Sequence, residues 1–310
     1  MKKIALAIHG GAGTLIKGMM TPEKESMYKA VLERALQKGY LLLESGGSAV
    51  EAVEASVKEL EDSHLFNAGK GSVFTSEGKH EMDASIMDGK TLNAGAISLV
   101  SGIKNPISLA RDVMEKSDHV FLASKGAMQF AEKLKYHLEN EKYFYDELRF
   151  QQWQEIRGSK SFKLDHSVNK DSKFGTVGAV ACDSFANLAA ATSTGGMTNK
   201  QFGRVGDSSM IGAGNYANNK TCAVSCTGSG EYFIRGVAAY DLSCLMEYKN
   251  LSLQDAAEEL IQNRLLNIGG DGGLIAVDAL GNIAMPFNTE GMYRACKSSD
   301  CADQISIYMN

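Results

Sequence analysis

Two segments in the second half of the chain each read as a strand, a short turn and a second strand. The first, "TVGAVACDSFANLAAATSTGG", begins at Thr176, and the second, "GLIAVDALGNIAMPF", begins at Gly273. Each turns through the pattern D-x-x-[AG]-N, at residues 183–187 and 278–282. Strand-forming runs joined by so short a turn predict antiparallel neighbours. A fold for this chain must therefore contain antiparallel sheet.

Helices are predicted in pairs between the strands. Pro22 opens the first helix and Gly46 follows its end. Ser48 and Glu51 form a capping box that starts a second helix, which runs through about Asp62. The other helical patterns follow the proline at 106 and cover residues 124–139, 230–248 and 252–266.

The remaining strands complete the order of elements. Residues 4–13, "IALAIHGGAG", predict a buried strand entering a glycine turn, and residues 66–74 predict a loop entering a strand. A hairpin is predicted around Asp88 and Gly89. Short turns between strands and paired helices favour an α+β fold, a four-layer αββα sandwich, over a doubly wound βαβ fold.

Composition narrows the class of protein. The net charge is −5 with no basic block, which argues against a nucleic-acid or membrane partner. No apolar stretch is long enough to span a bilayer, and the apolar run after Lys3 ends at His9, too early for a signal peptide. We therefore expect a cytoplasmic protein. The six cysteines include no C-x-x-C pair, so we expect reduced, structural cysteines rather than zinc ligands.

Two familiar kinds of catalytic pattern are weak here. The segment "HGGAG", residues 9–13, could cradle a phosphate, but it lacks a Walker lysine and the next helix starts only near residue 21. A structural turn is the better interpretation. The six histidines show no metal-ligand spacing, and no G-x-S-x-G elbow occurs, so structural roles are favoured for them as well.

Thr176 stands at an abrupt change in the sequence. The segment before it, from about residue 154 to residue 175, has no sustained hydrophobic period and is typical of a linker or exposed loop. A hydroxyl nucleophile needs a base, and a threonine at a newly made amino terminus carries one, an α-amine with a pKa of roughly 7.7 to 8. Taken alone, "FGTVG" still reads more readily as an ordinary strand start.

Other motifs along the chain change that balance. "HGGAG", "FNAGKGSVF", "GTVGAVA", "TSTGG", "GRVGDS" and "TGSGE" occur in this order. In this combination nearly the whole chain resembles the plant-type asparaginase and isoaspartyl peptidase family of N-terminal-nucleophile hydrolases. The segment "NTEGMYRA", residues 288–295, makes the resemblance strongest to the bacterial isoaspartyl dipeptidase members.

The resemblance implies a role for each matching residue. Thr176 matches the nucleophile, freed when the precursor cleaves its own Gly175–Thr176 bond. Thr194 matches a second threonine, which is expected to hydrogen-bond the first. Thr227 and Gly228 match the oxyanion hole.

Further matches concern substrate and metal. Arg204 and Asp207 match anchors for an α-carboxylate and an α-ammonium, although a surface ion pair is the simpler interpretation without the resemblance. Asn67 matches a family position near the nucleophile. One segment resembles a loop that holds a structural sodium ion through backbone carbonyls, here those of Leu60, Glu61, Ser63, Phe66, Ala68 and Lys70.

Two positions depart from the family pattern. Ser209 stands where many relatives have proline, and Ala186 replaces the usual turn glycine. Neither is a proposed catalytic position, so the implied activity is unaffected.

The implied protein is a self-processing hydrolase. It would release L-aspartate from β-aspartyl (isoaspartyl) dipeptides and L-asparagine through a covalent β-aspartyl–threonine ester, with no cofactor for catalysis. One αββα domain over residues 1–310 would be cut into residues 1–175 and 176–310, which stay together. The resemblance further implies a homodimer of precursors that matures to an (αβ)2 heterotetramer.

The sequence leaves three alternative functions. A glycosylasparaginase-like amidase is disfavoured because no secretory signal is recognised. An uncleaved, non-catalytic binding protein is disfavoured because Thr176, Thr194 and Thr227 are intact. A small-molecule kinase would use "HGGAG" for phosphate, and stabilisation by nucleotide would distinguish it.

Overall fold

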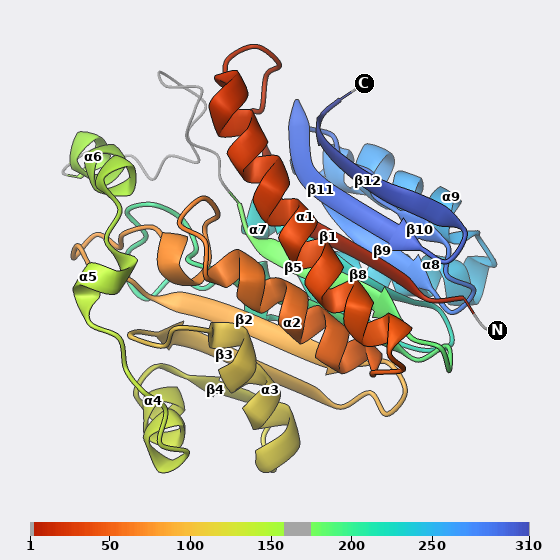
Figure 1. Ribbon diagram of the computed structural model, residues 1–310, viewed down its shortest axis with the longest axis horizontal. Helices are drawn as coiled ribbons and strands as arrows, with labels where there is room; N and C mark the ends of the chain where they lie inside the picture. Colours follow the sequence, from red (N-terminus) through yellow and green to blue (C-terminus); the bar gives the residue numbers. More distant parts are fainter. Residues whose placement is uncertain (1–2, 158–174, 310) are drawn as a thin grey trace.

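The computed structural model describes residues 3–157 and 175–309 of the chain. In these ranges two β-sheets lie face to face between two layers of helices, so the predicted α+β, four-layer αββα sandwich is confirmed (Figure 1). Most of the predicted linker, from about residue 154 to residue 175, lies outside the described residues. Its first residues belong to a helix, α6 (Glu147–Ile156), which the sequence pattern did not predict.

The larger sheet has eight strands among the described residues. Every neighbouring pair is antiparallel except the parallel pair β3 and β4. The order across the sheet is β12 (Cys301–Tyr308), β11 (Gly291–Ser298), β1 (Ala5–Gly13), β5 (Val177–Cys182), β6 (Leu188–Thr194), β2 (Met82–Asp88), β3 (Ala94–Val100) and β4 (Phe121–Ala123).

The smaller sheet is antiparallel throughout. Its order within the described part of the chain is β10 (Ile283–Ala284), β9 (Gly272–Asp278), β8 (Cys222–Gly228) and β7 (Asn215–Ala217). Both predicted strand–turn–strand segments are therefore confirmed, one in each sheet.

Two helical layers cover the outer faces of the sheets (Figure 1). The larger sheet is covered by α1 (Pro22–Glu44), α2 (Ala49–Glu61) and α3 (Pro106–Lys116). The smaller sheet is covered by α7 (Gly230–Gly236), α8 (Ala238–Lys249), α9 (Leu253–Glu258) and the π-helical turn η3 (Glu259–Leu265) that continues α9. The remaining helices are α4 (Ser124–Lys133) and α5 (Glu141–Phe144).

Strand alternation divides the apolar residues among three layers. In β5, Ala179 packs toward the outer helices whereas Val180 packs between the two sheets. Val224 of β8 belongs to a third cluster under α8 and α9. Because alternate residues of a strand face opposite sides, both faces of each sheet are buried.

The shared turn pattern has a common cause. The carboxylate of Asp183 accepts hydrogen bonds from the backbone N–H groups of Phe185 and Asn187, each at 2.9 Å. Asp278 repeats this at Leu280 and Asn282. The fourth residue of each turn is left-handed, with φ of 63° at Ala186 and 78° at Gly281. Ala186 therefore holds a conformation that glycine adopts with less strain.

Several sequence predictions about element boundaries were wrong. The strand β1 continues to Gly13 instead of turning, with a register shift between His9 and Gly11. Residues 66–74 contain a 3₁₀ turn, η1 (Gly69–Gly71), and the next strand along the chain is β2. The helix predicted at 124–139 ends at Lys133, and the one predicted at 230–248 is broken at Val237. The end of the chain, for which no strand was predicted, forms the hairpin of β11 and β12.

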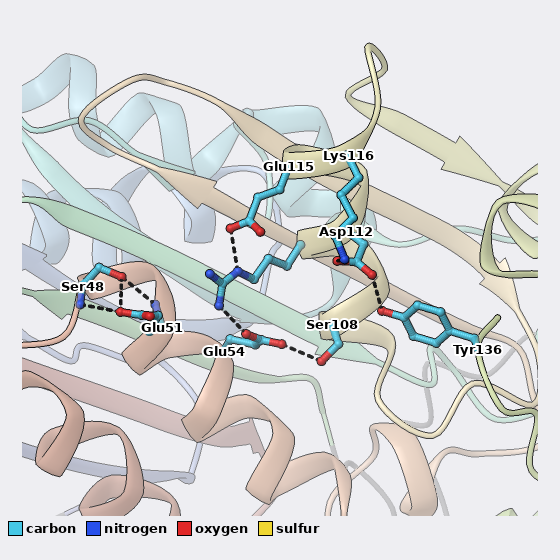
Figure 2. Close-up of polar contacts among 9 residues, drawn as sticks. Ser48, Glu51, Glu54, Ser108, Asp112, Glu115, Lys116 and Tyr136 are labelled. Atoms are coloured by element: carbon cyan, nitrogen blue, oxygen red, sulfur yellow. Dashed lines mark hydrogen bonds and ion pairs between the residues drawn. The ribbon is translucent and has the colours of Figure 1, made fainter. Parts of the chain in front are cut away.

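Polar contacts fasten α3 to α2 on the outside of the larger sheet (Figure 2). Ser108 donates a hydrogen bond of 2.6 Å to one carboxylate oxygen of Glu54, and Arg111 donates one of 2.7 Å to the other. Asp112 accepts from Tyr136 at 2.9 Å and pairs with Lys116 at 2.7 Å.

Over the described residues, no helix combines the length and the apolar character that crossing a membrane requires.

Candidate active site

Thr176 lies at the start of β5, in the layer between the two sheets, and is only 6% exposed. Val177 pairs with Ser193, so the next pair in this antiparallel register brings Thr176 beside Thr194. Directly opposite residues on neighbouring strands point to the same face. The two threonines therefore project together toward the smaller sheet.

The hydroxyls of these threonines have other partners than the sequence predicted. Thr176 Oγ1 lies 3.1 Å from Ser208 Oγ, on the 3₁₀ turn η2 (Asp207–Ser209). Thr194 Oγ1 accepts a hydrogen bond of 3.0 Å from the backbone N–H of Gly196. The predicted hydrogen bond between Thr176 and Thr194 is therefore not formed, because each hydroxyl is turned toward a loop on its own side.

The glycine-rich end of β1 packs against Gly175. A Cβ atom on Gly11, whose φ is +113°, would lie 2.8 Å from the backbone nitrogen of Gly175. A Cβ atom on Gly175 would in turn lie 2.7 Å from Thr227 Oγ1. The "HGGAG" segment thus uses glycine for close backbone contact with the residue before Thr176.

Thr227 and Gly228 stand at the end of β8, facing the same region. Thr227 Oγ1 accepts a hydrogen bond of 3.2 Å from the N–H of Ala12, which leaves its own proton free to be donated. Gly228 is exposed and has a φ of +147°, and a Cβ atom there would lie 2.3 Å from the carbonyl oxygen of Asp271. Only glycine fits this position.

Arg204 is held by a residue that the sequence interpretation did not single out. Its Nε and Nη2 donate to the two carboxylate oxygens of Glu231, both at 2.9 Å. Burial of Glu231 acts to raise the pKa of its carboxyl, but the hydrogen bonds and charge of Arg204 prevail and lower it. Glu231 therefore forms a bidentate ion pair with this guanidinium.

Asp207 is buried beside that pair. Burial raises the pKa of its carboxyl to about 7, while the charge of Arg204 opposes the shift. Its Oδ2 has no hydrogen-bond partner among the described residues. A Cβ atom on Gly230 would lie 2.7 Å from Asp207 Oδ1 and 3.1 Å from Arg204 Nη2. The two side chains thus converge on one spot, as recognition of a group with both charges requires.

Asn67 braces the segment that follows Thr194. Its Nδ2 donates to the carbonyl of Gly196 at 2.7 Å, and its backbone carbonyl accepts from the N–H of Gly195 at 3.0 Å. Its Oδ1 accepts from the N–H of Val73 at 3.1 Å. Asn67 therefore supports the position of Thr194 from the other side of the loop.

The predicted sodium loop folds back on itself after α2. A Cβ atom on Gly69 would lie 2.5 Å from the carbonyl oxygen of Glu61, and one on Gly71 would lie 2.1 Å from that of Phe66. Several of the predicted carbonyls already accept backbone hydrogen bonds, those of Leu60, Phe66 and Ala68. In the described ranges no group of three or more His, Cys, Asp or Glu side chains could hold a metal ion. A cation in this loop would thus depend on second lone pairs of carbonyls, which fits a hard ion.

Sequence reasoning missed Ser208 and Glu231 as members of the site. Both stand inside motifs that it used, "GRVGDS" and "TGSGE". The available signal was a polar side chain close to a predicted site residue, since Ser208 follows Asp207 directly and Glu231 comes soon after Gly228. It also missed Asp83 and Lys200, which are buried in the same region.

Known proteins match this chain along nearly its whole length. A family model described as "Asparaginase" matches residues 2–307. The chain is 51% identical to an isoaspartyl peptidase of Salmonella typhimurium and 50% identical to one of Escherichia coli, over 95% of this chain and 95% and 93% of theirs. It is 44% identical to a plant-type L-asparaginase of Thermococcus kodakarensis, over 93% of this chain and 94% of that one. Matched along nearly its whole length, the chain belongs to this asparaginase family.

Proposed function

We propose that this protein is an isoaspartyl peptidase and L-asparaginase that releases L-aspartate. The observation that carries the proposal is the setting of Thr176, whose Oγ1 lies 3.1 Å from Ser208, the residue after Asp207, and whose neighbour Gly175 packs against Thr227 Oγ1. The printed names of the relatives, isoaspartyl peptidase and plant-type L-asparaginase, support the same reaction class.

The first step we propose is cleavage of the chain by itself. The hydroxyl of Thr176 attacks the carbonyl carbon of Gly175, and the peptide nitrogen leaves as the α-amine of Thr176. Water then hydrolyses the ester, giving residues 1–175 a carboxylate and freeing the hydroxyl again. The close approach of Thr227 Oγ1 to Gly175 supports this step, since that hydroxyl can stabilise charge on the attacked carbonyl.

The freed α-amine of Thr176 then acts as the base in substrate turnover. It takes the proton of the Thr176 hydroxyl, which attacks the side-chain carbonyl of the substrate to form a tetrahedral oxyanion. The Thr227 hydroxyl and the Gly228 N–H donate to that oxygen, and one such donor is worth roughly 3 kcal/mol. The proton passes to the leaving amine or ammonia, and water hydrolyses the β-aspartyl ester to aspartate.

The charged pair accounts for selection of an α-amino acid head group. Glu231 occupies Nε and Nη2 of Arg204, so Nη1 is the nitrogen left to meet an α-carboxylate. The unpartnered Oδ2 of Asp207 suits an α-ammonium. The substrate thus binds beside two side chains that each keep one polar atom available.

Assembly and ion content belong to the same proposal. The two cleavage products remain in one αββα domain, because β1 and β5 are neighbours in the larger sheet although they fall in different products. We further propose a homodimer that matures to an (αβ)2 heterotetramer, a cytoplasmic location, and a structural sodium ion held by the carbonyls of residues 60–70.

Amino-terminal sequencing of purified protein, run beside an aspartate-release assay, tests the proposal. We expect a second amino terminus beginning at Thr176 and release of aspartate from both isoaspartyl-leucine and asparagine. A single full-length species with no aspartate released would refute it.

A further inference from the structure

The segment from Gly195 to Arg204 connects the two halves of the candidate site. It begins directly after Thr194 and ends at the predicted substrate anchor. Within it, Asn199 and Phe202 have left-handed backbone, with φ of 64° and 55°. Non-glycine residues in this region cost free energy, so surrounding contacts must impose the conformation.

Lys200 is the residue through which the segment is anchored. It is only 4% exposed, and its Nζ donates a hydrogen bond of 2.8 Å to the carbonyl of Glu81. Its carbonyl accepts from the N–H of Ser76 at 3.0 Å. A Cβ atom on Gly196 would lie 3.1 Å from Nζ, so the ammonium passes directly under the loop. A lysine seldom lies so deep unless a negative charge accompanies it.

The charge of Asp83 acts on Lys200, although the two side chains form no ion pair. Asp83 is fully buried and pairs in register with Thr194, on the next strand of the larger sheet. Its Oδ1 accepts from the N–H of Leu99 at 2.9 Å, while Oδ2 has no hydrogen-bond partner among the described residues. Burial raises the pKa of Asp83 and lowers that of Lys200, and in each case the charge of the other residue opposes the shift. The two groups therefore favour each other's ionised form.

The two ends of the segment are held by different residues. Asn67 bonds Gly195 and Gly196 and so fixes the end beside Thr194. The backbone of Lys200 lies nearer the other end, where the N–H of Arg204 donates to the carbonyl of Gln201 at 2.9 Å in a turn. Loss of the Lys200 anchor should thus disturb Arg204 more than Thr194.

We propose that Lys200 is a positioning residue for substrate capture, because it holds the strained segment that carries Arg204. The inference rests on the proposed function above. It separates two supports of the site: Asn67 serves the nucleophile's side, and Lys200 serves the guanidinium that meets the α-carboxylate.

The test compares Lys200→Met with Asn67→Ala and wild type, measuring self-cleavage, kcat and KM for asparagine. For Lys200→Met we expect KM to rise about tenfold or more, with kcat and the cleavage rate within about threefold of wild type. For Asn67→Ala we expect the opposite pattern, with slower cleavage and lower kcat. Lys200→Arg, which keeps the charge, should restore most of the KM. Lys116→Met is the matched control, since that lysine pairs with Asp112 on α3, and its KM should not change.

If the wild-type protein is active and Lys200→Met has an unchanged KM, this inference alone is overturned. Equal losses of cleavage, kcat and KM would also overturn it, since they would indicate a general structural role. If Lys200→Met does not fold, Lys200→Gln takes its place, with a KM rise of about threefold or more expected and an unchanged KM counting against the inference. A wild-type protein that releases no aspartate would overturn the proposed function as well.

Discussion

Two polar regions of this molecule differ in whether all of their carboxylate oxygens have hydrogen-bond or ion-pair partners. In the contact between α2 and α3, both carboxylate oxygens of Glu54 and both of Asp112 are bonded (Figure 2). In the layer between the sheets around Thr176, Asp83 and Asp207 each keep one buried oxygen without a hydrogen-bond partner among the described residues.

The difference shows which region is organised for something besides stability. An unsatisfied buried oxygen costs roughly 1 to 3 kcal/mol, whereas partly exposed ion pairs contribute about 0 to 1 kcal/mol each. The outer contact therefore gives a small stability gain, and the inner layer accepts a cost. Such a cost is expected where a ligand or reacting group completes the missing bonds.

Removing the hydroxyl of Thr176 should give the largest effect. We expect Thr176→Ala to remain uncut and to lose turnover of asparagine by at least about 10⁴-fold, since the nucleophile is gone. Intact mass and an ammonia-release assay measure the two losses. Thr91→Ala, in the exposed turn between β2 and β3, is the control and should behave as wild type. Ammonia release by Thr176→Ala at the wild-type rate would remove Thr176 from the mechanism.

Glu61 lies two turns after Glu54 on the same helix, yet it resembles Asp207 of the inner layer, because it is a buried carboxyl with a raised pKa. It is fully buried, accepts from Ser193 at 2.6 Å, and burial raises the pKa of its carboxyl from 4.5 to about 8. The folded state therefore holds a proton that the unfolded state releases between those pH values. The contribution of Glu61 to the free energy of unfolding is therefore fully present below pH 4.5. It declines as pH rises toward 8, by up to about 1.4 kcal/mol per pH unit.

Urea unfolding at pH 5, 6.5 and 8 checks this pH dependence. Glu61→Gln, which cannot ionise, should flatten the decline, and Glu54→Gln on the same helix should leave it unchanged. Identical pH profiles for wild type and Glu61→Gln would show that other groups cause the decline.

Asp207 predicts a pH effect on substrate capture instead. Its pKa of about 7 means that the free enzyme loses this carboxylate as pH falls, and with it the partner of the α-ammonium. The α-amine of Thr176 loses its basic form over the same range. We expect kcat/KM for asparagine to fall more steeply than tenfold per pH unit below 7 in wild type. Asp207→Asn should be less active and fall no more than about tenfold per unit, from the amine alone. The same steep slope in both proteins would contradict the role given to Asp207.

The sequence predicted local structure better than contacts between distant segments. Helix starts at Pro22 and after Ser48, and the turns at Asp183 and Asp278, follow from local chemistry and were confirmed. The contacts of Ser208, Glu231 and Lys200 could not be foreseen, because they form between loops brought together only by the packing of two sheets. The continuation of β1 through its glycines was missed for the same reason, since pairing with β11 imposes it.

The smallest effect is expected at the outer contact. Glu54→Ala removes the acceptors of Ser108 and Arg111, but Arg111 keeps its 2.7 Å pair with Glu115 and both side chains can turn to water. We expect a loss of about 1 kcal/mol in the free energy of unfolding, with unchanged kcat and KM. Urea unfolding and asparagine kinetics measure the two. A change in KM at Glu54 would break the comparison, because it would mean that the outer helices, and not the inner layer alone, set the geometry around Thr176.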